Sequence, residues 1–126
     1  MSKYLIDTNI FIDALRGQEI SANFLRANYS NSVVSYITFN ELIQGADNKK
    51  NLINLEELIS LYEINYSSSD ISRRATNLVR EFYLKNGLKI LDAIIASTAL
   101  ELNLVLITQN IKHFKFIKGI KVENLI

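Results

Sequence analysis

Three carboxylates and two neutral polar side chains of this sequence are candidates for one polar site. They are Asp7, Glu41, Asp92, Thr108 and Asn110. Asp7 directly follows one short apolar run, and Thr108 follows another. In open α/β sheets, ligands bind beyond the carboxyl ends of the strands, where the strand order reverses. If both runs are strands of such a sheet, these side chains can converge on one crevice.

The oxygen atoms of these side chains limit the chemistry that the site can perform. Carboxylates a few ångströms apart repel one another, so one must stay protonated or a cation must bridge them. Ligand sets made only of oxygen suit Mg²⁺ or Mn²⁺ better than zinc or copper. Such an ion can activate a water molecule and stabilise charge that develops on a phosphate, in a one-metal or a two-metal form. The three carboxylates therefore predict a divalent-cation site.

Each carboxylate also has a structural explanation that involves no ligand. Asp7 or Thr8 could N-cap a helix, and Thr38–Glu41 matches the capping-box pattern. Asp92 could stand in the first turn of a helix, where a negative charge interacts favourably with the helix dipole. Asp70, in a cluster of serines, is expected to have that role alone. Spacing leaves the structural and the functional explanations open.

The composition excludes most other routes to catalysis. The chain of 126 residues has no cysteine, which excludes disulfides, thiolate zinc sites and cysteine nucleophiles. Its one histidine, His113, excludes a multi-histidine metal site and disfavours a Ser-His-Asp mechanism. The length favours one domain with a core of its own, spanning residues 1–126.

The net charge of +1 is the sum of 14 basic and 13 acidic residues that are unevenly placed. The basic residues gather in two segments, Arg73, Arg74, Arg80, Lys85 and Lys89 before Asp92, and Lys112, Lys115, Lys118 and Lys121 after Asn110. A basic surface beside an acidic crevice suits a polyanion whose phosphodiester is to be cut. The alternative for the C-terminal run is a solvated lysine face.

The remaining candidates are interpreted as structural. Asp13 and His113 are expected on the surface. The tyrosines are expected at the edges of the core rather than as platforms for bases; they are Tyr29, Tyr36, Tyr62 and Tyr66. The apolar faces of 11–15 and 52–59 are assigned mostly to the core, although a subunit or a peptide groove could share them.

Alternation of short apolar runs with longer amphipathic stretches is typical of βα units around a parallel sheet. Strands are expected at 4–6, 31–36, 61–66 (near a sheet edge), 104–107 and 121–123. Helices are expected over 20–29, 38–45, 51–60, 68–86 and 91–102, with a first one that ends at Gly17. The predicted fold class is a three-layer α/β/α domain with a central, mainly parallel sheet.

The sequence shows no segment that resembles a membrane span, which needs about 18 apolar residues. The apolar stretch near its first residue is too short for a signal peptide, and it is soon followed by an acidic residue, Asp7. We therefore expect a cytoplasmic protein with no membrane partner.

Four motifs in order resemble those of a PIN domain across essentially the whole chain. They are Tyr4–Asp13, Ser35–Gly45, Leu91–Ala96 and Leu106–Phe114. The size is similar to that of the single-domain VapC-type toxins of bacterial and archaeal toxin–antitoxin pairs.

The resemblance implies a Mg²⁺- or Mn²⁺-dependent endoribonuclease that cleaves structured RNA, tRNA or rRNA. It also implies a homodimer and a cognate antitoxin whose C-terminal segment blocks the groove. By position, Asp7 and Asp92 would be the main metal ligands. Glu41 would orient or activate water, or ligate a second ion, and Thr108 would hydrogen-bond within the site.

At Asn110 the chain departs from many members of the family, which have an aspartate two residues after the threonine. A neutral amide adds no charge, so the number of metal ions, one or two, stays open. A phosphatase of the haloacid-dehalogenase type is disfavoured because Asn9 stands where its second aspartate is needed. The alternative function is a non-catalytic PIN-like module that binds RNA or protein.

Overall fold

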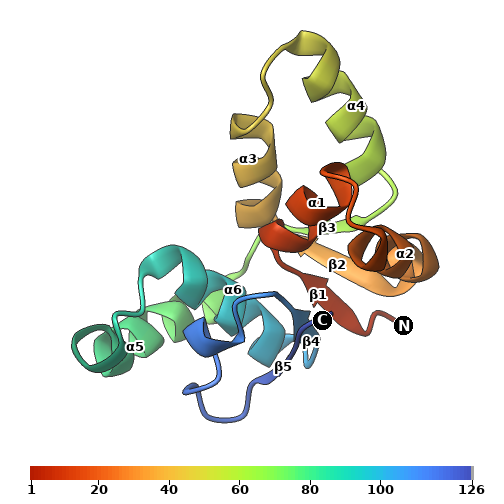
Figure 1. Cartoon of the computed structure of the whole chain (residues 1–126). Coiled ribbons are helices and arrows are strands. Elements are labelled where there is room, and N and C mark those ends of the chain that lie inside the picture. Colours follow the sequence, from red (N-terminus) through yellow and green to blue (C-terminus); the bar gives the residue numbers. More distant parts are fainter. Residues whose placement is uncertain (126) are drawn as a thin grey trace.

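The computed structural model describes residues 1–125 and contains one sheet surrounded by helices (Figure 1). The strands are β1 Tyr4–Ile6, β2 Ser32–Ser35, β3 Glu63–Asn65, β4 Val105–Ile107 and β5 Lys121–Glu123. The α-helices are α1 Thr8–Leu15, α2 Glu19–Asn28, α3 Tyr36–Gln44, α4 Lys49–Ile59, α5 Ser69–Asn86 and α6 Ile90–Glu101. Two short 3₁₀ helices complete the set, η1 Tyr29–Asn31 and η2 Ile111–His113.

The sheet has the strand order β3-β2-β1-β4-β5, and all four pairings are parallel. The chain adds β2 and β3 on one side of β1, then returns to add β4 and β5 on the other side. The strand order therefore reverses between β1 and β4, where Leu5 pairs with Leu106. Ligands of open parallel sheets bind at this switch point, beyond the carboxyl ends of the strands.

Alternation along the strands gives the sheet two apolar faces. Leu5, Val33 and Leu106 belong to one buried cluster, together with residues of α5 and α6. The residues that follow them in the chain, Ile6, Val34 and Ile107, belong to a second cluster under α1, α2 and α4. Helices thus cover both faces, as Figure 1 shows, and the predicted three-layer fold with a parallel sheet is confirmed.

Capping side chains and a glycine define the ends of two helices. Asn48 and Ser68 N-cap α4 and α5, each accepting a hydrogen bond from a backbone N–H of its first turn. Gly87 ends α5 in the left-handed conformation at φ 74°, which glycine adopts without a steric penalty. This turn leads at once into α6, where six residues from Ala93 to Ala99 are buried.

Several predicted boundaries are shifted by one or two residues, and one of these shifts bears on the site. The strand expected to reach Tyr36 ends at Ser35, whose hydroxyl accepts a hydrogen bond from the backbone N–H of Ile37 at 3.2 Å and N-caps α3. The helix therefore starts before Thr38, and the capping box suggested for Thr38–Glu41 does not exist. The carboxylate of Glu41 is free to face another part of the protein.

No helix among residues 1–125 is both long enough and apolar enough to cross a membrane.

Candidate active site

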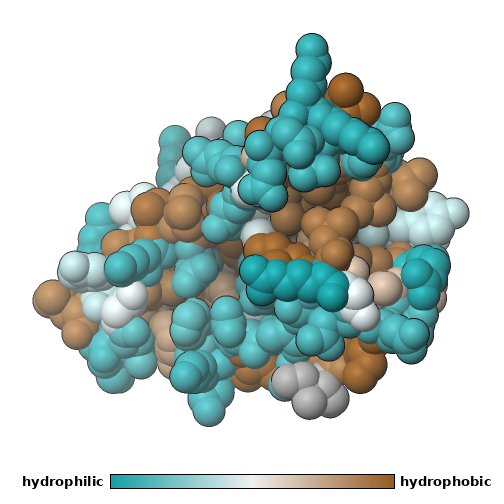
Figure 2. All heavy atoms as spheres, turned by 45° about the horizontal axis from the view of Figure 1, so that its top comes forward, coloured by the Kyte–Doolittle hydropathy of each residue, from teal (hydrophilic) through white to brown (hydrophobic). Residues whose placement is uncertain are grey.

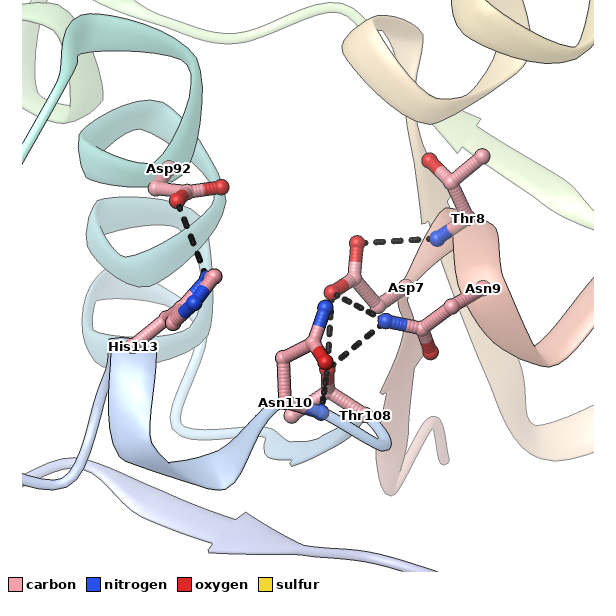
Figure 3. Close-up of polar contacts among 7 residues, drawn as sticks. All are labelled: Asp7, Thr8, Asn9, Asp92, Thr108, Asn110 and His113. Atoms are coloured by element: carbon pink, nitrogen blue, oxygen red, sulfur yellow. Dashed lines mark hydrogen bonds and ion pairs between the residues drawn. The ribbon is translucent and has the colours of Figure 1, made fainter.

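Asp7 stands at the switch point because β1 ends at Ile6 and α1 begins at Thr8. It N-caps α1, and its Oδ1 accepts a hydrogen bond from the backbone N–H of Thr8 at 2.8 Å. Its Oδ2 accepts hydrogen bonds from the Thr108 hydroxyl at 2.8 Å and from the Asn9 amide at 3.4 Å. The structural and the functional explanations for Asp7 are thus compatible, since the cap leaves the carboxylate at the sheet edge (Figure 3).

Burial raises the pKa of Asp7 above its ordinary value of 3.8. The hydrogen bonds from Thr108 and Thr8 act in the opposite direction, because they stabilise the charged form. The charges of Asp92 and Glu41 raise the pKa further. The net result is a carboxylate whose charge is poorly compensated by the protein and would be stabilised by a cation.

Thr108 connects β4 to Asp7. Its hydroxyl is fully buried and donates to Asp7, while it accepts hydrogen bonds from the Asn9 side-chain amide at 3.2 Å and the Asn110 backbone N–H at 3.0 Å. The side-chain oxygen of Asn9 in turn accepts from the backbone N–H of Gln109 at 3.1 Å. These bonds hold the ends of β1 and β4 in one arrangement, which fixes the position of the Asp7 carboxylate.

Glu41 enters the site from α3. Its Oε1 accepts a hydrogen bond from the Thr8 hydroxyl at 2.7 Å, and that hydroxyl also lies 3.4 Å from the hydroxyl of Thr38. Burial is the main cause that raises the pKa of Asp7 and of Asp92, and the charge of Glu41 adds to it in both cases.

Asp92 lies in the first turn of α6 and faces the same open space as Asp7 (Figure 3). Its Oδ2 is 3.9 Å from Nδ1 of His113, a contact that is attractive when the imidazole is protonated. Burial raises the pKa of Asp92; His113 lowers it and Glu41 raises it. Asp92 is therefore a second carboxylate whose charge is unfavourable without a cation.

The structure brings the five predicted side chains to one edge of the sheet, with the carboxylates spread around the space between α1, α3 and α6. Among residues 1–125, no three acidic or histidine side chains lie close enough together to hold one ion as they are oriented. The donors nevertheless fit Mg²⁺, which keeps several of its water molecules and is usually bound through one or two carboxylates. Two aspartates with raised pKa values are suited to that form of coordination.

The contacts of Asn9 and His113 within this cluster were not predicted from the sequence, and neither was the partial burial of Asp13. Asn9 was not predicted as a site residue, although its position two residues after Asp7 on the first turn of α1 was a signal. His113 is exposed as expected, yet it faces Asp92 rather than only solvent. Asp13 was expected on the surface, but it is half-buried and accepts a hydrogen bond from the Gln109 amide at 3.4 Å.

The two basic segments differ in how many of their charges are paired. Arg74 forms an ion pair with Glu101 at 3.0 Å, and Lys121 donates to the side chain of Asn103 at 3.3 Å. Lys112, Lys115 and Lys118 are exposed. The C-terminal lysines next to Asn110 therefore form a surface that can attract a polyanion, as the sequence suggested.

Fold and site together define a class: an α/β protein with an acidic, oxygen-only site at the switch point of a parallel sheet. The PIN domain family model matches residues 4–118. The chain belongs to the PIN-domain family, and its relatives place it among the VapC-type members.

Two relatives match over most of their length. The chain is 31% identical over 133 residues to the tRNA(fMet)-specific endonuclease VapC of Salmonella typhimurium strain LT2, with 98% of each chain covered. It is 32% identical over 114 residues to Ribonuclease VapC19 of Mycobacterium tuberculosis, with 87% of this chain and 90% of the relative covered.

Solved structures give the same result. A toxin–antitoxin complex from Klebsiella pneumoniae contains a chain with a TM-score of 0.81 and 35% identity, over 94% of this chain and 95% of that one. A chain of the DNA-bound VapBC from Salmonella typhimurium has a TM-score of 0.86 and 28% identity, over the whole of both chains.

Proposed function

We propose that this protein is a metal-dependent endoribonuclease and the toxin of a type II toxin–antitoxin pair, with tRNA or rRNA as its structured substrate. The observation that carries the proposal is the convergence of Asp7, Glu41 and Asp92 at the switch point, where two of them have raised pKa values. The ribonuclease names of the relatives support the same activity.

Asp7 and Asp92 are the residues that would hold Mg²⁺ or Mn²⁺, and Glu41 would hold a second ion or orient the attacking water. When bound, the ion supplies a nucleophile at neutral pH and stabilises charge on the phosphate. Thr108 and Asn9 position the Asp7 carboxylate, and Thr8 positions the Glu41 carboxylate. Asn110 presents a neutral amide at the edge of the site, and its backbone is held by Thr108.

The face formed by α1, α3 and α4 of this chain is a suitable binding surface for the antitoxin. A groove of about 610 Å³ lies there and is lined by both apolar and polar residues. The apolar side chains are Ile12, Leu15, Leu42 and Leu55. Glu41 also lines the groove, so a peptide bound in it would cover part of the site. In Figure 2, apolar atoms are gathered in the upper part of the view, with hydrophilic atoms around them.

Three further parts of the proposal concern assembly and location. We assign residues 1–126 to one PIN domain. We also expect a homodimer and a cytoplasmic location, where RNA substrates are found. Exposed Tyr83, Leu84, Ile90 and Leu91, at the turn between α5 and α6, offer an apolar surface for a second copy. Sedimentation of the purified toxin distinguishes a dimer from a monomer.

Incubation of the purified chain with total tRNA and rRNA, with and without Mg²⁺, tests the proposed activity. We expect discrete fragments only when Mg²⁺ or Mn²⁺ is present, and none from Asp7→Asn. If the wild-type protein binds RNA but produces no fragments with either ion, the chain is a non-catalytic binding module instead.

A further inference from the structure

The carboxyl ends of the strands form the edge of the sheet that carries the acidic site. This edge includes the ends of β2 and β3, and a tyrosine directly follows each of these two strands. Tyr36 comes directly after Ser35 at the end of β2, and Tyr66 directly after Asn65 at the end of β3. Ser35 and Asn65 are paired in the parallel register, so the two tyrosines leave the sheet side by side. Their rings are stacked, with centroids 6.4 Å apart and planes 24° from parallel.

The two rings differ in burial, so one ring is held by the core and the other is open to solvent. Tyr36 is half-buried and packs against the core cluster under α5 and α6, so its ring is held in place. Tyr66 is 69% exposed although it is stacked on that fixed ring. An aromatic ring that is ordered by one neighbour and open to solvent is a suitable platform for a base, because stacking needs only a free π face.

A pocket of about 390 Å³ lies beside Tyr66, at the start of α5. It is lined by Tyr66, Arg73 and the hydroxyl-bearing Ser67, Ser68, Ser69 and Ser72. Within residues 1–125, Arg73 makes no ion pair, whereas its neighbour Arg74 pairs with Glu101. The pocket thus combines an aromatic ring, neutral hydroxyls and an uncompensated guanidinium, the groups that a base, a sugar and a phosphate require.

We propose that Tyr36, Tyr66 and Arg73 form a subsite for one unpaired nucleotide of the substrate RNA, a few nucleotides from the bond that is cut. The base stacks on Tyr66, which Tyr36 supports from behind, and the phosphate pairs with Arg73. Neighbouring strands lie about 4.8 Å apart, so the end of β3 is about 10 Å along the edge from the end of β1. A few extended nucleotides cover that distance. This inference rests on the proposed nuclease function and adds a single-stranded element to its substrate.

Short single-stranded RNAs that carry the fluorescent base 2-aminopurine, at each position in turn, test the subsite with the full-length toxin in EDTA. We expect quenching at one position, because stacking on an aromatic ring quenches this base. Tyr66→Ala should abolish the quenching and weaken binding about tenfold or more, since stacking contributes strongly per base. Tyr66→Phe should retain both effects. Arg73→Ala should weaken binding and reduce its salt dependence.

Tyr29→Ala and Arg26→Ala are the matched controls. Both residues are exposed and lie before β2, at the opposite edge of the sheet, and both variants should bind like the wild type. In cleavage assays with Mg²⁺, Tyr66→Ala should raise KM and leave kcat nearly unchanged.

The subsite is contradicted if the wild type shows no quenching at any position, or if Tyr66→Ala binds, quenches and cleaves like the wild type. The proposed nuclease function fails by a different result, namely the absence of cleavage by the wild type itself in the presence of the ion.

Discussion

The ends of β1 and β4 and the ends of β2 and β3 form two halves of one sheet edge, with different chemistry. In the first half, Asp7 and Thr108 are joined by a hydrogen bond, and burial together with the neighbouring carboxylates raises the pKa of Asp7. In the second half, Tyr36 and Tyr66 are stacked on each other. Each half lies at the carboxyl ends of two parallel strands, so the different chemistry of the two halves comes from the residues that follow the strands.

Asp7 and Asp70 extend the comparison to two carboxylates at helix starts. Asp70 lies exposed in the first turn of α5, where its charge interacts favourably with the helix dipole. Asp7 caps α1 but is also largely removed from solvent and faces two other carboxylates. A position at a helix start therefore does not distinguish a structural from a functional carboxylate, whereas burial and acidic neighbours do.

The largest expected effect is a loss of kcat when a carboxylate of the acidic half is neutralised. Asp92→Asn should lower kcat by about 100-fold or more, because a metal ligand contributes several kcal/mol to transition-state stabilisation. Steady-state cleavage of the RNA substrate measures kcat and KM. Asp70→Asn is the control and should cleave like the wild type. If Asp92→Asn retains full kcat, the acidic half of the edge is not the catalytic half.

A smaller loss of kcat is expected when Asp7 is kept and only the hydroxyl that donates a hydrogen bond to it is removed. Thr108→Val deletes the hydroxyl that donates to Asp7 and accepts from Asn9 and the Asn110 backbone. We expect kcat to fall about tenfold, with a loss of roughly 1–3 kcal/mol in the free energy of unfolding.

Thr98→Val supplies the control for this loss of stability. Thr98 is equally buried, and its hydroxyl donates to the carbonyl of Ile94 within α6. The variant should lose stability without the loss of kcat. Equal kcat values for the two variants would show that the Thr108 hydroxyl supports the fold and not the site.

The smallest effect is a pH dependence of stability in the absence of divalent cations. The folded state binds the Asp92 proton more tightly than the unfolded state does, because the pKa of Asp92 is raised in the fold. The wild type should therefore lose stability relative to Asp92→Asn as the pH rises from the ordinary range near 3.8 through the raised pKa. Chemical unfolding of both proteins across acidic to neutral pH measures the difference. A wild type that instead gains stability relative to Asp92→Asn would refute the sign.

The fold was predictable because its signals are local. Apolar runs such as Leu104–Ile107 and the amphipathic pattern of 68–86 depend on neighbouring residues, and both elements were confirmed. The boundary after β2 was not predictable, because Tyr36 and Ile37 continue an apolar pattern that suits a strand or a helix. The Ser35 cap decides in favour of the helix.

The sequence predicted which residues lie together at this edge of the sheet, but it did not predict the contacts between them. Residues far apart in the chain meet through the pairing of β1 with β4, which brings the Asn9 amide to Thr108. The stacking of Tyr36 on Tyr66 likewise depends on the register of β2 against β3. The approach of His113 to Asp92 depends on the path of η2. Such contacts are set by tertiary structure, which no local pattern in the sequence encodes.

Titration of Mg²⁺ into the RNA-free protein, followed by calorimetry and by the thermal unfolding temperature, tests the central claim most directly. An ion that binds only the folded state stabilises it, by about 2.7 kcal/mol at a concentration one hundred times the Kd. We predict saturable binding and a higher unfolding temperature for the wild type and for Tyr66→Ala, and the loss of both for Asp7→Asn and Asp92→Asn. Binding that persists in both aspartate variants, or that is absent from the wild type, would contradict the assignment of this edge as a metal site.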